Sequence, residues 1–191
     1  MTDIAGYLSA SAAAAAALVV RPGAGAIEQA ARMVADALTD DGQVLFCGNG
    51  GSAADAQHLA AELVGRLARE RLAYRALALT TDTSVLTAVS NDYGYAEAFA
   101  RQVQGLGRRG DVLVVITTSG RSENVLRAAA AAREAGLVVI AFLGPSRSPL
   151  DDVADLALHV DGDRPSLVQQ GHITVGHALC AWVETRLAGR R

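Results

Sequence analysis

A histidine and a glutamate four residues apart could carry acid–base chemistry or hold a metal ion. His58 and Glu62 lie in the stretch 52–66, whose apolar spacing predicts a helix. Residues four apart share one face of a helix. The spacing alone is compatible with a general acid–base pair, with two metal ligands, or with an ordinary surface contact.

Two loops rich in glycine and hydroxyl side chains offer a second kind of chemistry. Gly48–Ser52 follows the apolar run Val44–Cys47, and Thr117–Ser122 follows Asp111–Ile116. Each loop leads into an expected helix, where free N–H groups, hydroxyls and closely approaching glycine backbone can cradle a phosphate. A glycine-rich turn also occurs as a plain strand–helix connection. Four hydroxyls within the six residues of the second loop are more than such a turn needs.

A third set of polar residues lies at the last expected helix: Gln169, His172 and His177. His172 and His177 diverge by about 140° around a helix, so the two imidazoles do not face one site. Gln169 and His177 are about 80° apart with a rise of about 12 Å, and we therefore expect Gln169 in a non-helical lead-in. A lone histidine in so apolar a helix is more often a core residue than a ligand.

The elements that must position these residues alternate between strand and helix. The expected strands are Val44–Cys47, Ala76–Leu79, Asp111–Ile116, Val138–Leu143 and Leu156–Val160. The expected helices are Thr2–Val20, 27–41, 52–66, 82–89, Ala96–Leu106, Glu123–Ala135 and Leu167–Leu187. This order predicts an α/β domain spanning 1–191, with a doubly wound parallel sheet and helices on both faces. Residues 43–191 would form the sheet and its helices. Residues 1–42 have no strand between their two helices, and we expect them to pack against a partner subunit.

Composition narrows the class of protein. The chain has 191 residues, of which 51% are hydrophobic and only 4% aromatic, so its core must be Ala, Val and Leu. A net charge of −3, without a basic stripe, argues against a nucleic-acid binder. Cys47 and Cys180 show no metal-finger spacing and fit a reduced, cytoplasmic protein. The apolar run Ala12–Val20 is too short to span a bilayer.

Four segments in order resemble the signatures of the phosphoheptose isomerases, a family built on the sugar isomerase (SIS) domain. They are Phe46–His58, Ser90–Tyr95, Gly110–Leu113 with Thr117–Ser122, and the set Gln169, His172 and His177. The resemblance covers nearly the whole chain. It implies a parallel five-stranded sheet of the flavodoxin/Rossmann-like type, flanked by helices, and a homotetramer with active sites at subunit contacts. It also implies isomerisation of sedoheptulose 7-phosphate to D-glycero-D-manno-heptose 7-phosphate through an enediol.

The resemblance also implies a role for individual residues. Glu62 and His177 match the catalytic pair of the family. Some members hold zinc, and the corresponding ligands would be His58, Glu62, Gln169 and His177. The positions that match substrate contacts are Asn49, Gly50, Gly51, Ser52, Arg66, Asp92, Thr117, Thr118, Ser119, Ser122 and Gln169.

The chain departs from the family pattern at one place, and two other functions fit the same fold. Leu167 and Gln170 stand where the family commonly has a basic and an acidic residue. One alternative is a non-catalytic SIS-domain regulator that binds a replication-initiator protein. The regulator of this kind lacks a histidine at the position of His177, so His177 favours the enzyme. The other alternative is an isomerase or binding domain for another sugar phosphate.

Overall fold

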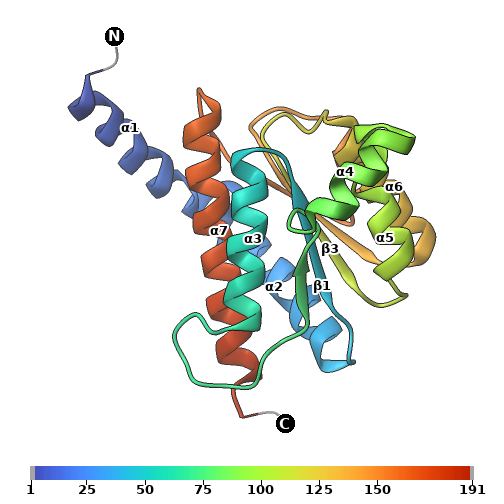
Figure 1. The fold of residues 1–191 in the computed structure, drawn as a ribbon. Helices are drawn as coiled ribbons and strands as arrows, with labels where there is room; N and C mark the ends of the chain where they lie inside the picture. The colour runs from blue at the N-terminus through green and yellow to red at the C-terminus, as the bar shows by residue number, and fades with distance from the viewer. Residues whose placement is uncertain (1–2, 190–191) are drawn as a thin grey trace.

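The computed structural model, which describes residues 3–189, places a five-stranded parallel sheet between two layers of helices (Figure 1). The strands are β1 Val44–Gly48, β2 Ala76–Ala78, β3 Val112–Thr117, β4 Val138–Leu143 and β5 Leu156–His159. Their order in the sheet is β2-β1-β3-β4-β5, and every neighbouring pair is parallel. The predicted doubly wound α/β class is confirmed.

The central strands are buried along their whole length, as their continuous apolar sequences predict. Successive side chains point to opposite faces, so one sequence supplies two cores. Val44 and Phe46 of β1 pack with α2 (Ala24–Thr39), α3 (Gly51–Val64) and α7 (Pro165–Leu187). Leu45 and Cys47 pack with α5 (Ala100–Leu106) and α6 (Glu123–Ala135). Alanine is abundant in both cores, which lets the helices lie close to the sheet.

The sheet order creates a crevice where the loops of interest emerge. The chain leaves β1 towards β2 on one side and returns to β3 on the other side of β1. At such a switch point the connections diverge, and ligands bind outside the carboxyl ends of the two strands. β1 ends at Gly48, the first residue of the first loop, and β3 ends at Thr117, the first residue of the second loop, so both loops lie at this edge.

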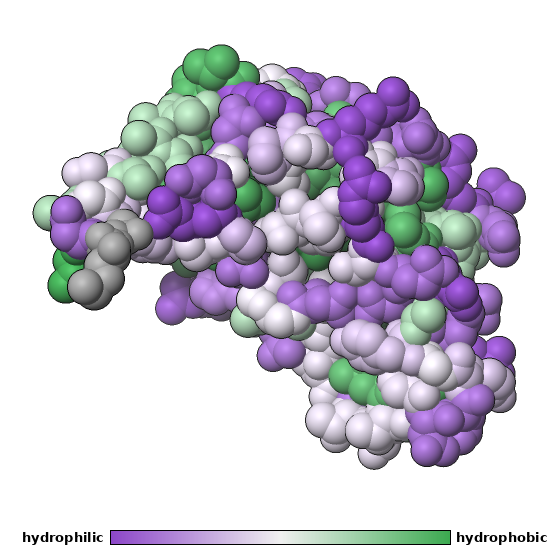
Figure 2. All heavy atoms as spheres, turned by 90° about the horizontal axis from the view of Figure 1, so that it is seen from above, coloured by the Kyte–Doolittle hydropathy of each residue, from purple (hydrophilic) through white to green (hydrophobic). Residues whose placement is uncertain are grey.

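The N-terminal helix α1 (Ile4–Ala17) has no buried residue and contacts α7. Apolar surface runs along this arm, at the left of Figure 2. By length and composition alone, the run Ile4–Thr39 could cross a membrane, but Arg21 (φ −142°, ψ 116°) breaks the helix between α1 and α2. The 14 residues of α1 span about 21 Å, less than the ~30 Å of a hydrocarbon core. Thr2, with which the predicted helix begins, lies outside the described residues.

Most predicted element boundaries agree with the structure to within a few residues, and the differences concern four candidate site residues. Gly51, expected in the first loop, is the first residue of α3, and Arg66, expected at the end of that helix, lies beyond its last residue Val64. The helix expected to end near Val89 is α4 (Thr83–Tyr93), which is capped by Asp82 and ends only at Gly94. Asp92 therefore lies on a helix and not in a loop. Thr117, expected to begin the second loop, is the last residue of β3.

Candidate active site

The helices α3 and α7 pack side by side and run parallel, and a glycine permits their close contact (Figure 1). A Cβ atom on Gly176 would lie 2.5 Å from both Cδ atoms of Leu59. The next residue along α7 is His177, and the residue before Leu59 is His58. The close packing therefore brings two histidines together that are 119 positions apart in the sequence.

His58, Glu62 and His177 form a compact triad on the outer side of these two helices. The Nε2 atoms of His58 and His177 are 2.9 Å apart, and His58 Nε2 lies 3.1 Å from Glu62 Oε1. One ligand atom from each residue lies within 4.8 Å of the other two. The His58 side chain is 51% exposed and that of Glu62 18%, so the triad is open to solvent on one side. Such a group can exchange protons with a ligand or hold a divalent metal with an open position.

Gln169, the fourth predicted metal ligand, contacts the start of α3, whereas His58 and Glu62 lie further along that helix. It lies inside α7 and not in a non-helical lead-in, because Pro165 already starts the helix at its first position. A Cβ atom on Gly51 would lie 2.6 Å from Gln169 Nε2, so the amide packs on the first residue of α3. His58 is seven residues further along α3, a rise of about 10 Å.

His172 faces away from the triad, as its angular separation from His177 predicts. It is fully buried and its Nε2 lies 3.0 Å from the carbonyl oxygen of Leu143, so Nε2 carries the proton. Nδ1 finds no hydrogen-bond partner among residues 3–189. Burial lowers the pKa of His172 to about 4, although the bond to Leu143 opposes the shift. His172 is thus a neutral core residue.

Some hydroxyls of the second loop hold the loop in shape, and others can donate hydrogen bonds to a ligand. Thr117 Oγ1 accepts the N–H of Gly120 at 3.2 Å, and burial removes it from solvent. Gly120 has a φ of +64° and lies against Ser148, a position that only glycine can occupy. Ser119 is exposed and Ser122 half-buried at the start of α6, and its side chain caps no N–H there. Ser119 Oγ accepts the N–H of Arg121 at 3.3 Å and lies 3.5 Å from Thr117 Oγ1, and its exposed hydroxyl can still donate. Ser119, Ser122 and the half-buried Thr118 can therefore donate to an anion.

The two loops are joined by an amide pair. Asn49 and Asn124 exchange two side-chain hydrogen bonds, both of 2.9 Å, and the Tyr95 hydroxyl donates to Asn49 Oδ1 at 2.8 Å. Gly50, at φ 57° and ψ −120°, turns the first loop into α3. Asn124 and Tyr95 were not identified as site residues from the sequence. The sequence signal for Asn124 is an asparagine in the first turn of the Ala-rich stretch Glu123–Ala135, directly after the second loop.

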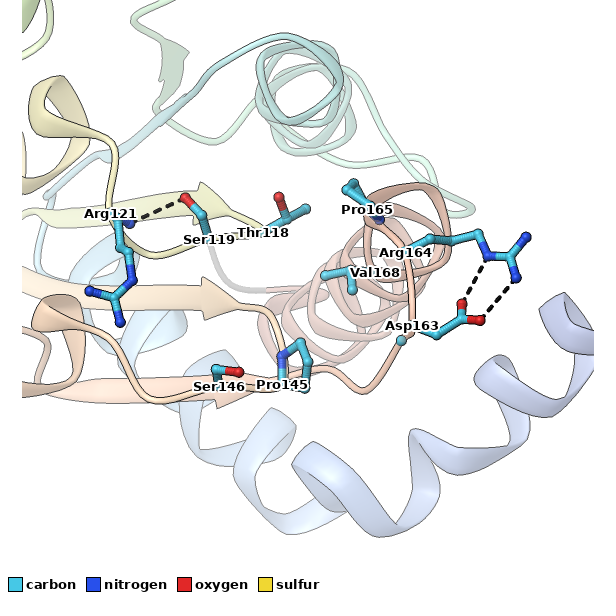
Figure 3. Close-up of a pocket in the computed structure, with 10 residues that line it drawn as sticks. Thr118, Ser119, Arg121, Pro145, Ser146, Asp163, Arg164, Pro165 and Val168 are labelled. Atoms are coloured by element: carbon cyan, nitrogen blue, oxygen red, sulfur yellow. Dashed lines mark hydrogen bonds and ion pairs between the residues drawn. The ribbon is translucent and has the colours of Figure 1, made fainter.

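A cavity of about 440 Å³ opens beside the second loop (Figure 3). It is lined by Thr118, Ser119, Arg121, Pro145, Ser146, Gly162, Asp163, Arg164, Pro165 and Val168. In Figure 3 the loop residues Ser119 and Arg121 lie opposite Pro165 and Val168 of α7. Hydroxyls and an arginine next to a helix N-terminus suit a phosphate. The triad residues do not line this cavity, so the site of one chain has two separate parts.

The remaining predicted site residues lie outside both parts. Ser52 is buried in the first turn of α3. Arg66 is exposed beyond the end of α3, with Nε 3.7 Å from a carboxylate oxygen of Glu70. Asp92 is exposed and accepts a hydrogen bond from the Asn91 side chain.

Comparison with known proteins gives one consistent result. A family model described as the SIS domain matches residues 7–144. A phosphoheptose isomerase from Akkermansia muciniphila is 50% identical over 166 residues, covering 87% of this chain and 88% of its own. One from Rhodospirillum rubrum is 54% identical over 162 residues, covering 85% and 86%.

Solved structures of phosphoheptose isomerases have the same fold as this chain. A phosphoheptose isomerase from Neisseria gonorrhoeae superposes with a TM-score of 0.87 and 41% identity, covering 95% of this chain and 97% of that one. One from Francisella tularensis gives a TM-score of 0.89 and 38% identity, covering 95% and 96%.

Proposed function

Because the chain belongs to the phosphoheptose isomerases of the SIS-domain family, we propose that Glu62 and His177 carry the proton transfers of its reaction. The enzyme is an aldose–ketose isomerase that converts sedoheptulose 7-phosphate to D-glycero-D-manno-heptose 7-phosphate. The observation that supports the assignment is the approach of both side chains to His58, at 3.1 and 2.9 Å.

The reaction moves one hydrogen from C1 to C2 of the open-chain sugar. Glu62 takes the proton from C1 while His177 gives a proton to the C2 oxygen, which produces the enediol. His177 then takes the proton of the C1 hydroxyl, and Glu62 returns its proton to C2. Every proton that leaves the substrate is returned, so the two groups end in their starting states. Each well-placed acid or base contributes about 10²–10⁴-fold to such a reaction.

The phosphate would bind at the second loop. Thr118, Ser119 and Ser122 would supply hydroxyl donors, the start of α6 would supply N–H groups, and Arg121 lines the same cavity. The sugar would contact the first loop through Asn49, Gly50 and Gly51. Thr117 and Ser52 would support the loops from inside, since both are buried.

A second copy of the chain would complete the site. The cavity and the triad do not meet in one chain, and α1 exposes an apolar surface. We therefore propose a homotetramer, with active sites at subunit contacts and residues 1–42 in the packing. Arg66 and Asp92, both exposed here, would reach a substrate held by a neighbouring copy.

The triad also fits a zinc ion. Two imidazole nitrogens and one carboxylate oxygen, all within 4.8 Å of one another, form a ligand set found in catalytic zinc sites. Zinc held by His58, Glu62 and His177 would polarise the sugar carbonyl and stabilise the enediolate. Because Glu62 and His177 would both be ligands, the bound ion would compete with their action as free base and acid. Gln169 stays a prediction as the fourth ligand, because it packs on Gly51 within its own chain.

The two cysteines support a proposal for the cellular setting. Cys47 and Cys180 are both free and buried, as expected in a reducing compartment. We propose that the enzyme works in the cytoplasm on a sugar phosphate, without nucleic acid or membrane as a partner.

Replacement of the proposed base tests the function. Glu62→Gln keeps the shape of the side chain and removes the base, so kcat should fall at least about 10²-fold with KM little changed. His177→Asn should do the same. Glu134→Gln, at an exposed glutamate on α6, is the control.

Isotope exchange gives a second measurement. Wild-type enzyme in deuterated water should introduce deuterium at C1 or C2 of sedoheptulose 7-phosphate, detected by NMR together with the product. A folded Glu62→Gln enzyme with near-normal turnover and exchange would show that Glu62 is not the base.

A further inference from the structure

The loop that connects α3 to β2 contains one buried charged side chain, Arg71, and covers a second, Glu184. The loop 65–75 has no regular structure, yet the Arg71 side chain is only 6% exposed and that of Glu184, on α7, only 3%. Buried charges are costly unless they are paired and hydrogen-bonded. The contacts of these two side chains should therefore show what they organise.

Glu184 binds the start of this loop. Its carboxylate accepts the consecutive N–H groups of Leu67, Ala68 and Arg69 at 3.1, 2.9 and 3.0 Å. Arg71 Nε lies 3.4 Å from the same carboxylate. Burial opposes ionisation of Glu184, but the three N–H groups and Arg71 outweigh it and hold the pKa of Glu184 below its ordinary value.

Arg71 binds the end of α3. Its Nη1 donates to the carbonyl oxygens of Leu63, Gly65 and Leu72 at 2.8, 3.1 and 2.9 Å. Its Nη2 donates to the carbonyl oxygen of Glu62 at 2.7 Å. The last carbonyls of a helix have no partner within the helix, and a cation there is favourable. Arg71 thus fixes the final turn of α3, which would otherwise be free to fray.

These contacts converge on the two helices that carry the triad. Glu62 is two residues from the end of α3, and Arg71 binds its backbone directly. Glu184 is seven residues, or about two turns, beyond His177 on α7. The pair therefore ties the turn that carries Glu62 to the helix that carries His177.

We propose that Arg71 and Glu184 are positioning residues for the isomerisation, which hold the Glu62 carboxylate within reach of the substrate and of His177. The inference rests on the proposed role of Glu62. Without the pair, the last turn of α3 loosens and the Glu62 carboxylate is misplaced. A misplacement of about 1 Å can cost 10²-fold in rate.

Conservative variants of both residues test the proposal. Arg71→Lys keeps the charge but cannot donate to four carbonyls in a fixed plane. Glu184→Gln keeps the shape and removes the charge. We expect kcat for sedoheptulose 7-phosphate to fall about 10- to 100-fold in Arg71→Lys, and by a smaller factor in Glu184→Gln, with KM within about twofold. If Arg71→Lys does not fold, the milder Glu184→Gln carries the test.

A control separates positioning from simple loss of stability. Leu187→Ala removes a buried side chain from the same end of α7, where Leu187 lies beside α2, and should lower the melting temperature with kcat unchanged. If kcat falls equally in Leu187→Ala and Arg71→Lys, the pair serves only the stability of the fold and the inference is wrong.

A double variant separates this inference from the function on which it rests. If Arg71 acts through Glu62, Arg71→Lys in the Glu62→Gln background should lower kcat no further. Normal turnover in Glu62→Gln alone would overturn the proposed function. A large loss in Glu62→Gln with normal turnover in Arg71→Lys and Glu184→Gln would overturn only the positioning role.

Discussion

Histidine serves opposite purposes at different positions of this chain. His58 and His177 are accessible and lie beside a carboxylate, where an imidazole can take up and release protons. His172, five positions before His177, is enclosed and has one partnered nitrogen. The difference arises from the burial of each ring and not from its sequence neighbours, because all three residues lie on helices.

The buried histidine predicts a pH dependence of stability. The pKa of His172 is about 4 in the folded protein against an ordinary 6.5, so the unfolded chain takes up the proton first as the pH falls. Its contribution is constant above about pH 6.5 and is lost towards pH 4, by about 2 kcal/mol between pH 7 and pH 5. Burial raises the pKa of Asp55 to about 6, so Asp55 takes up a proton more readily in the folded state and opposes this loss between pH 7 and pH 5. Urea unfolding of wild type and of His172→Leu should therefore show the His172 contribution as the difference between the two curves.

Carboxylates whose pKa is lowered in the folded protein do not contribute to the change in stability between pH 7 and pH 5. Burial opposes ionisation of Asp151, but the Ser148 N–H and His159 outweigh it and lower its pKa, and Glu184 is lowered too. Such groups lose their contribution only as the pH falls towards and below their ordinary pKa values, 3.8 for Asp151 and 4.5 for Glu184. Parallel curves for wild type and His172→Leu would show that His172 does not titrate as described.

The phosphate loop gives a second prediction at this scale. Ser119→Ala and Ser122→Ala each remove one hydroxyl that the fold leaves available, and each should weaken sugar-phosphate binding by about 1.5–3 kcal/mol. Steady-state kinetics and inhibition by inorganic phosphate measure the effect. Ser84→Ala, at the exposed start of α4, should change nothing. Unchanged KM and inhibition constants in both loop variants would show that this loop does not bind the phosphate.

At the scale of elements, the contact between α3 and α7 decides whether the triad forms. The helices approach at Gly176 and Leu59, one residue from the paired histidines. Leu59 is 1% exposed, so its side chain has no free space into which it could move. The Arg71–Glu184 pair secures the same two helices one to two turns further along.

Adding one methyl group at this contact should separate the helices. Gly176→Ala should destabilise the protein by about 1–3 kcal/mol and lower kcat, because α3 moves away from His177. The control is Gly105→Ala in α5, where a Cβ atom would meet nothing within 4 Å. Alanine there should be neutral or stabilise by about 0.5–1 kcal/mol. Urea unfolding of both variants checks this, and Gly176→Ala as stable as wild type would contradict it.

At the scale of the whole molecule, the chain leaves an apolar arm uncovered. Ile4, Leu8, Val19 and Val20 are each more than 60% exposed, on a segment that contacts α7 and buries none of its own residues except Leu18. Contiguous exposed apolar surface of this kind marks an association site in soluble proteins.

Deletion of residues 1–20 should therefore change the assembly. In sedimentation, wild-type protein should behave as a tetramer, and the truncated chain as smaller species or aggregates with reduced kcat. Ile4→Ser with Leu8→Ser tests the same surface in the full chain. A well-behaved and fully active monomer, intact or truncated, would contradict both the assembly and the shared active site.

Local features of the fold could be predicted from the sequence, because they depend on neighbouring residues. The unbroken apolar runs of β3 and β4 predict buried parallel strands, and Asp82 predicts the cap of α4. Glycine and hydroxyl residues after apolar runs predict ligand loops at one edge of the sheet. The family and its reaction also follow from sequence, since four motifs in a fixed order are specific.

The convergence of distant residues was decided only by the tertiary structure. The four-residue spacing predicts that His58 and Glu62 are neighbours on one helix. The position of His177 beside them depends on how α3 and α7 pack at Gly176. The same packing places Gln169 on Gly51 at the start of α3, and Arg71 at the end of α3. Helix packing is the sum of many weak contacts between surfaces far apart in the chain, so no spacing within one segment determines it.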